Sequence, residues 1–127
     1  MKQLRILLVE DDPVIGLLLA ELLVGLGHSV CATVGTEPDA VAAAARHAPD
    51  LMVVDVHLAE GSGISAMGTI GRTRAMAHVF MTGALPNSLP VTTTVLHKPF
   101  FERDLVRALA EAWDATSSPP PAPARIN

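Results

Sequence analysis

Short apolar runs that end in polar residues recur along the chain. The clearest is Leu51-Met52-Val53-Val54-Asp55, in which four apolar residues, two of them β-branched, precede one carboxylate. Uninterrupted apolar runs of this length are typical of strands that are buried on both faces of a sheet. A carboxylate at the end of such a strand costs free energy unless a cation, a lysine or a partner's phosphate pairs with it. The partners of Asp55 are therefore expected elsewhere in the chain.

Similar runs occur four more times, and helical patterns lie between them. We expect strands at residues 6–9, 29–34, 51–55, 78–81 and 91–96. We expect helices at residues 13–26, 36–47, 64–74 and 102–115. This alternation predicts an α/β fold, with a doubly wound parallel sheet, helices on both faces and right-handed crossovers.

The first predicted helix has clear ends but an unusual composition. Asp12 is a favourable N-cap, Pro13 suits the first turn and Gly27 ends the helix. Glu21 is the only charged residue in residues 13–26. We expect most of this helix to pack against the sheet and a neighbouring helix, and part of its surface to be available for docking a partner.

Two segments lack a regular pattern. Residues 84–90 contain two prolines and an asparagine, which predicts a loop or a single helical turn, so a full helix does not fit there. Four of the ten prolines fall within residues 119–123. We therefore expect one domain over residues 1–115 and a disordered, proline-rich tail over residues 116–127.

Composition narrows the class of protein further. Half of the 127 residues are apolar and 17% are charged, which excludes disorder for most of the chain. The net charge of −4 and the scattered lysines and arginines argue against a nucleic-acid-binding surface. The single cysteine, Cys31, excludes an internal disulfide and favours a reducing compartment. No signal peptide is visible and residues 14–26 are too short to span a bilayer, so we expect a soluble, cytoplasmic protein.

Polar residues follow four of the predicted strands. They are Glu10 and Asp11 after the first strand, Asp55, Thr82, and Lys98 after the last strand. Because the carboxyl ends of parallel strands share one edge of a sheet, we expect these side chains to converge. Three carboxylates repel one another, and Mg²⁺, which prefers oxygen ligands, would relieve that repulsion. Such a site fits phosphoryl transfer, with Asp55 as the nucleophile.

In these positions the sequence resembles the receiver domains of two-component response regulators. The matching motifs are Val9-Glu10-Asp11-Asp12-Pro13, Val54-Asp55-Val56, Met81-Thr82-Gly83 and Lys98-Pro99-Phe100, in the family's order. The likeness covers about residues 4–115. It implies a flavodoxin-like fold with strand order 2-1-3-4-5 and a shortened or missing fourth helix.

The resemblance also implies a role for each site residue. Asp55 would accept a phosphoryl group from the phosphohistidine of a sensor histidine kinase or a phosphotransfer protein. Mg²⁺ would be held by Asp11 and Asp55, by Glu10 through water, and by the main-chain carbonyl of His57. Thr82 and Lys98 would bind the phosphoryl oxygens. The protein would thus be a stand-alone signalling receiver that catalyses only its own phosphorylation and dephosphorylation.

Two features depart from the usual receiver pattern. Val95 stands where most receivers carry an aromatic residue that turns inward when the threonine moves, and the segment from Thr82 to Lys98 is short. The chain therefore looks like the subgroup of receivers that lacks this aromatic. We expect phosphorylation to reorder the Gly83–Pro90 loop instead, and the altered face or the apolar first helix to allow a homodimer.

Other functions are less consistent with the sequence. An aspartate-nucleophile phosphatase needs a second acid shortly after the nucleophile, whereas the next acid after Asp55 is Glu60. A dinucleotide-binding domain needs a glycine-rich loop after the first strand, and Gly25-Leu26-Gly27 follows a helix. A degenerate receiver that binds partners without phosphorylation remains the alternative. The spacing of His57 and His97 fits no zinc site.

Overall fold

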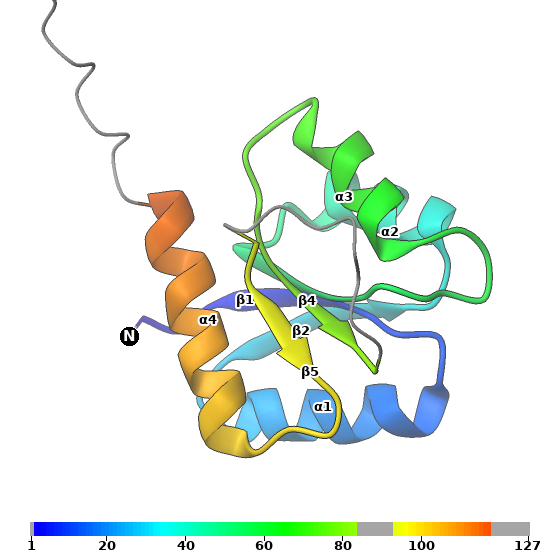
Figure 1. Cartoon of the computed structure of the whole chain (residues 1–127). Helices are drawn as coiled ribbons and strands as arrows, with labels where there is room; N and C mark the ends of the chain where they lie inside the picture. Colours follow the sequence, from blue (N-terminus) through cyan, green and yellow to red (C-terminus); the bar gives the residue numbers. More distant parts are fainter. Residues whose placement is uncertain (1, 84–92, 118–127) are drawn as a thin grey trace, which may run out of the picture.

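The computed structural model describes residues 2–83 and 93–117. Five parallel strands form one sheet in the order β2-β1-β3-β4-β5, which confirms the predicted order and the flavodoxin-like fold (Figure 1). The strands are β1 (Arg5–Val9), β2 (Ser29–Val34), β3 (Leu51–Asp55), β4 (Ala77–Thr82) and β5 (Val95–His97).

Four helices cover the two faces of the sheet. They are α1 (Pro13–Gly25), α2 (Glu37–His47), α3 (Gly63–Gly71) and α4 (Glu102–Ser117). In Figure 1, α1 and α4 lie on one side of the strands, and α2 and α3 lie on the other. Alternate residues of each central strand face opposite pairs of helices. Ile6 of β1 packs in the core under α1 and α4, and Leu7 packs in the core under α2 and α3. Both faces are therefore buried, as the uninterrupted apolar runs predict.

The helix starts follow from local chemistry. The Asp12 carboxylate accepts hydrogen bonds from the backbone N–H groups of Val14 and Ile15, at 2.9 and 3.2 Å. The Thr36 hydroxyl oxygen accepts one from Asp39 N–H at 3.2 Å. These caps satisfy N–H groups that have no partner within a helix, so α1 and α2 begin where the sequence predicts.

Three element boundaries differ from the prediction by two residues or more. The third helix ends at Gly71 instead of Arg74, where the Thr73 hydroxyl donates to the Ile70 carbonyl and competes with further helical turns. The fifth strand begins at Val95 instead of Val91, because residue 93 lies in a bend and the pairing with β4 starts at Phe80 and Val95. The last helix continues to Ser117, although residues 116 and 117 were expected in the tail.

The remaining expectations for these segments lie outside the described residues. They are the loop or turn at residues 84–90, its proposed reordering, the missing fourth helix and residues 118–127 of the tail. Within residues 2–83 and 93–117, no helix combines the length and the apolar composition needed to cross a bilayer.

Candidate functional site

The acids after β1 and β3 meet at the carboxyl edge of the sheet. Val9 pairs with Val54, so Glu10 and Asp55 occupy neighbouring positions where the two strands end. Glu10 is 4% exposed and Asp55 is 6% exposed, whereas Asp11 is exposed to solvent. Oxygen atoms of these three carboxylates lie within 4.8 Å of one another. The structure therefore brings together the acids that the sequence singles out.

Lys98 joins the two buried acids. Its Nζ lies 2.8 Å from Asp55 Oδ2 and 3.0 Å from Glu10 Oε1, and its side chain is 25% exposed. The backbone N–H of Lys98 donates to the Thr82 carbonyl at 2.9 Å, which fixes the lysine where β5 ends. Breaking a buried ion pair by removing one partner is costly, because the remaining charge keeps its desolvation penalty. Lys98 is thus the counter-ion of the cluster.

Burial and the hydrogen bond between Glu10 and Lys98 act in opposite directions on the pKa of each group. Burial raises the pKa of Glu10, and the nearby carboxylates of Asp11 and Asp55 raise it further, although hydrogen bonds from Asp12 N–H and Lys98 oppose the rise. Burial alone would lower the pKa of Lys98, but hydrogen bonds to Asp55 and Glu10 raise it overall. Lys98 therefore holds its proton more firmly than a free lysine does, and a further cation beside Glu10 would favour the carboxylate form of Glu10.

The backbone on the far side of Asp55 is also closely fixed. His57 N–H donates to Asp55 Oδ1 at 3.0 Å, and Val56 N–H donates to the Met81 carbonyl at 3.0 Å. A Cβ atom on Gly63 would lie against the Asp55 carbonyl and 2.6 Å from Val54 Cγ1. Only glycine permits the first turn of α3 to approach the strand this closely. His57 itself is exposed, and its role as a main-chain ligand stays a prediction.

Thr82 and His97 lie on the neighbouring strands. Thr82 is fully buried at the end of β4, one residue beyond Met81, which pairs with Asp55. His97 pairs with Thr82 across β4 and β5 and is exposed. Val95, in place of the usual aromatic residue, is half-buried and packs with the core under α2 and α3.

The donor atoms of the acid cluster suit a hard divalent cation. Three carboxylates and one ammonium leave a charge of −2 when all four groups are ionised. All the candidate side-chain ligands are oxygens, and the exposed Asp11 leaves the cluster open to solvent on one side. Mg²⁺ prefers oxygen ligands and retains several waters, so these residues fit it.

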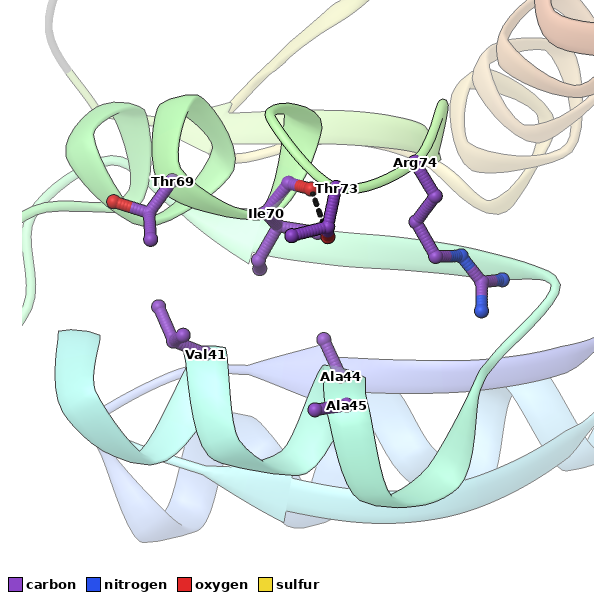
Figure 2. Close-up of a pocket in the computed structure, with 7 residues that line it drawn as sticks. All are labelled: Val41, Ala44, Ala45, Thr69, Ile70, Thr73 and Arg74. Carbon is purple, nitrogen blue, oxygen red and sulfur yellow. Dashed lines mark hydrogen bonds between the residues drawn. The ribbon is translucent and has the colours of Figure 1, made fainter.

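The described residues also form cavities outside this cluster. A groove of about 490 Å³ borders it and is lined by Lys98, Pro99, Phe100 and four residues of α1, which are Ile15, Leu18, Leu19 and Leu22. A second cavity, of about 220 Å³, lies between α2 and the end of α3, where Val41 and Ala44 face Ile70 (Figure 2). None of the predicted site residues lines the second cavity, so the groove beside Lys98 is the cavity relevant to the site.

Sequence reasoning assigned Glu37 only to the start of a helix. In the structure the Glu37 carboxylate accepts hydrogen bonds from Ser62 N–H, in the loop that follows Asp55, and from the Ser65 hydroxyl, in the first turn of α3. The topology did indicate that the two segments are close, because α2 and this loop both begin at the carboxyl edge of a parallel sheet. The contact itself depends on the loop conformation.

The fold and the placement of these residues define a receiver domain. The family model of the response regulator receiver domain matches residues 6–110. The chain belongs to this family.

Several relatives support the assignment. The chain is 31% identical to the phyllosphere-induced regulator PhyR of Methylorubrum extorquens, over 85% of this chain and 43% of that protein. It is 32% identical to the transcriptional regulatory protein PdtaR of Mycobacterium tuberculosis, over 83% of this chain and 54% of that protein. The solved receiver domain of PhyR from Erythrobacter litoralis matches with a TM-score of 0.83 and 30% identity, covering 96% of this chain and 98% of that domain. The chain thus spans about half the length of these two curated relatives.

Proposed function

We propose that the protein is a phosphorelay receiver in which Asp55 accepts a phosphoryl group. The observation that carries this proposal is the double contact of Lys98 Nζ with Asp55 Oδ2 and Glu10 Oε1, beside the exposed carboxylate of Asp11. A buried carboxylate between an ammonium group and an open acidic cluster is placed to be a nucleophile and to have its product charge neutralised.

The donor is the phosphohistidine of a sensor histidine kinase or a phosphotransfer protein. An Asp55 carboxylate oxygen forms a bond to phosphorus while the phosphorus–nitrogen bond breaks. The leaving imidazole nitrogen takes the bonding electron pair, and Asp55 becomes an acyl phosphate. Lys98 and the Thr82 hydroxyl bind the phosphoryl oxygens, so the protein's contribution is positioning and charge neutralisation.

The acid cluster would hold Mg²⁺ through Asp11 and Asp55, through Glu10 by way of water, and through the His57 carbonyl. When bound, Mg²⁺ supplies positive charge that offsets the charge of the transferred phosphoryl group. Glu10, buried and already hydrogen-bonded to Lys98, keeps the ammonium group beside Asp55.

The groove beside Lys98 is the surface on which we place the phosphodonor. Its walls are apolar, and it shares Lys98 with the site, so a protein that seats there brings a histidine close to Asp55. Neighbouring residues Val14, Leu17 and Leu18 of α1 are more than half exposed and extend the apolar surface. Burying exposed apolar surface is a general driving force for protein association.

The same proposal includes a downstream protein partner. A PhyR protein from Bartonella quintana, 28% identical to this chain, is described as an anti-anti-sigma factor. We propose that the phosphorylated receiver likewise acts by binding a protein, in the cytoplasm, with no direct contact to nucleic acid or membrane. A homodimer through the exposed residues of α1 is a second use of that surface, and sedimentation of the unphosphorylated and phosphorylated protein tests it.

Intact-mass spectrometry tests the central step. With Mg²⁺ and acetyl phosphate, or a cognate kinase, the protein should gain the mass of one phosphoryl group, and Asp55→Asn should abolish the gain. Asp12→Asn is the matched control, because asparagine retains the N-cap of α1 and should leave the gain unchanged. A wild-type protein that gains no mass with either donor would instead support a degenerate receiver, which binds partners without phosphorylation.

A further inference from the structure

The loop between β3 and α3 is held by the first residue of α2. Glu37 N–H donates to the Glu60 carbonyl at 2.9 Å, and Thr36 and Glu60 form a parallel bridge. Ser62 N–H donates to Glu37 Oε1 at 3.0 Å, and the Ser65 hydroxyl donates to Glu37 Oε2 at 2.7 Å. The backbone and side chain of Glu37 thus hold the loop at Glu60 and Ser62, and the first turn of α3 at Ser65.

Gly61 allows this close contact. Its φ of +79° lies in the left-handed region, which favours glycine. A Cβ atom at this position would lie against Glu37 Oε1 and 2.5 Å from Glu37 Cβ. The loop backbone and the Glu37 side chain are therefore packed so closely that no other residue fits between them.

The same loop reaches Asp55 at its other end. His57 forms an antiparallel bridge with Ser62, and His57 N–H donates to Asp55 Oδ1 at 3.0 Å. Gly63 N–H donates to the Val56 carbonyl at 3.0 Å, which closes the loop at its base. A continuous series of contacts therefore runs from Glu37 through Ser62 and His57 to Asp55.

Glu37 is ionised under neutral conditions. The hydrogen bond from Ser62 N–H, followed by that from the Ser65 hydroxyl, lowers its pKa. Hydrogen bonds to a carboxylate are stronger than those between neutral groups. The hold on the loop is therefore stronger than a neutral side chain at this position would provide.

We propose that Glu37 is a positioning residue for the cation site: it fixes the β3–α3 loop so that the His57 backbone is presented beside Asp55. This inference rests on the proposed function of the acid cluster. Groups that orient metal ligands from outside typically change metal affinity by about 10–100-fold when they are removed. Glu37 is not part of the acid cluster and its side chain bonds to Ser62 and Ser65, so we expect its removal to change cation affinity and not the transfer step.

The experiment compares Glu37→Ala and Glu37→Gln with wild type. Glutamine can still accept from Ser62 N–H and bond to Ser65, so it should restore most of the contact. Asp39→Ala is the matched control, because Asp39 is an exposed acid in the same first turn of α2. Gly61→Ala attacks the same contact from the loop side.

Two measurements decide the outcome without a phosphodonor. Calorimetric titration with Mg²⁺ should give a dissociation constant about tenfold higher for Glu37→Ala, and less than about threefold higher for Glu37→Gln and Asp39→Ala. Amide hydrogen exchange without Mg²⁺ should be faster at residues 57–62 in Glu37→Ala and in Gly61→Ala, and unchanged in β1 and β3. Faster exchange with an unchanged Mg²⁺ dissociation constant would reduce Glu37 to a structural role and overturn the proposal.

The phosphorylation assay separates this proposal from the proposed function. In wild type, the absence of any mass gain at Asp55 contradicts the proposed function, whereas the Mg²⁺ titration still tests Glu37. In Glu37→Ala, the phosphorylation rate should recover to within about twofold of wild type when Mg²⁺ is raised about tenfold. A rate that stays low at saturating Mg²⁺ would contradict a role confined to cation affinity.

Discussion

Buried polar groups at the two ends of the sheet have different kinds of partner. Of the residues that the structure describes, four polar ones are buried: Glu10, Asp55 and Thr82 at the carboxyl end, and His28 near the amino end. At the carboxyl end the buried acids share the charge of Lys98. At the amino end His28 Nδ1 accepts a hydrogen bond from Leu4 N–H at 3.0 Å, which requires a neutral ring nitrogen.

Because of this difference, the free energy of each end should depend on a different solution condition. The carboxyl end carries more carboxylates than cations, so its free energy depends on added cations and on the charge of Asp55. The amino end is held by a neutral hydrogen bond among apolar side chains, so its free energy depends on pH through His28. Under the proposed function, the buried polar groups at the carboxyl end belong to the site, whereas His28 at the amino end contributes to stability.

The largest effect should come from removing the shared counter-ion. Lys98→Met leaves Glu10 and Asp55 without their ammonium partner, and we expect the free energy of unfolding to fall by about 3 kcal/mol at neutral pH. Urea unfolding measures this change, and intact-mass analysis should show that phosphorylation is lost. Lys2, the other lysine of the chain, is the control: it lies over the Trp113 ring, and Lys2→Met should cost less than about 1 kcal/mol. Equal stability of Lys98→Met and wild type would show that the two acids do not need the lysine.

A smaller effect of the opposite sign should follow neutralisation of Asp55. The amide oxygen of Asp55→Asn can still accept from Lys98, and the repulsion with Glu10 and Asp11 is removed. Without Mg²⁺ we expect the free energy of unfolding to rise by about 1 kcal/mol. Because wild type binds Mg²⁺ more tightly, saturating Mg²⁺ should reduce or reverse this difference. Asp50→Asn, directly before the other end of β3, is the control and should show no such Mg²⁺ dependence. An equal rise in the free energy of unfolding of Asp55→Asn at all Mg²⁺ concentrations would argue against a cation site.

The smallest effect should appear at the amino end as the pH is lowered. Burial lowers the pKa of His28 below its usual value of 6.5, so the unfolded chain binds a proton more readily than the folded protein. The stability from neutral His28 is present above pH 6.5 and is lost as the pH falls toward the lowered pKa. Asparagine also has an acceptor that can face Leu4 N–H, and it does not titrate. The stability difference between wild type and His28→Asn should therefore change between pH 7.5 and 5.5; parallel curves would exclude His28 as the cause.

Apolar runs made the sheet and most of the site predictable. Each run ends where a strand ends, so the topology alone brings Glu10, Asp55 and Lys98 to one edge. The end of α3 and the start of β5 were not predictable, since they depend on the Thr73 hydroxyl and on the pairing of Phe80 with Val95.

Contacts that depend on loop conformation were also beyond sequence reasoning. The contact of Glu37 with Ser62 requires the positive φ of Gly61, which no local pattern in the sequence specifies. His28 follows a helix-ending glycine, and its burial is set by the packing of the surrounding elements instead of by its neighbours in the chain.

The strand that Lys98 directly follows, β5, is the shortest in the sheet. β5 pairs with β4 at three positions and forms an edge, whereas Glu10 follows β1 and Asp55 ends β3, both in the interior of the sheet. Local opening of an edge strand costs less free energy than global unfolding. A brief detachment of β5 would therefore withdraw the ammonium group from both acids and leave the other four strands intact. The net charge of the site thus depends on whether this edge strand is paired with β4.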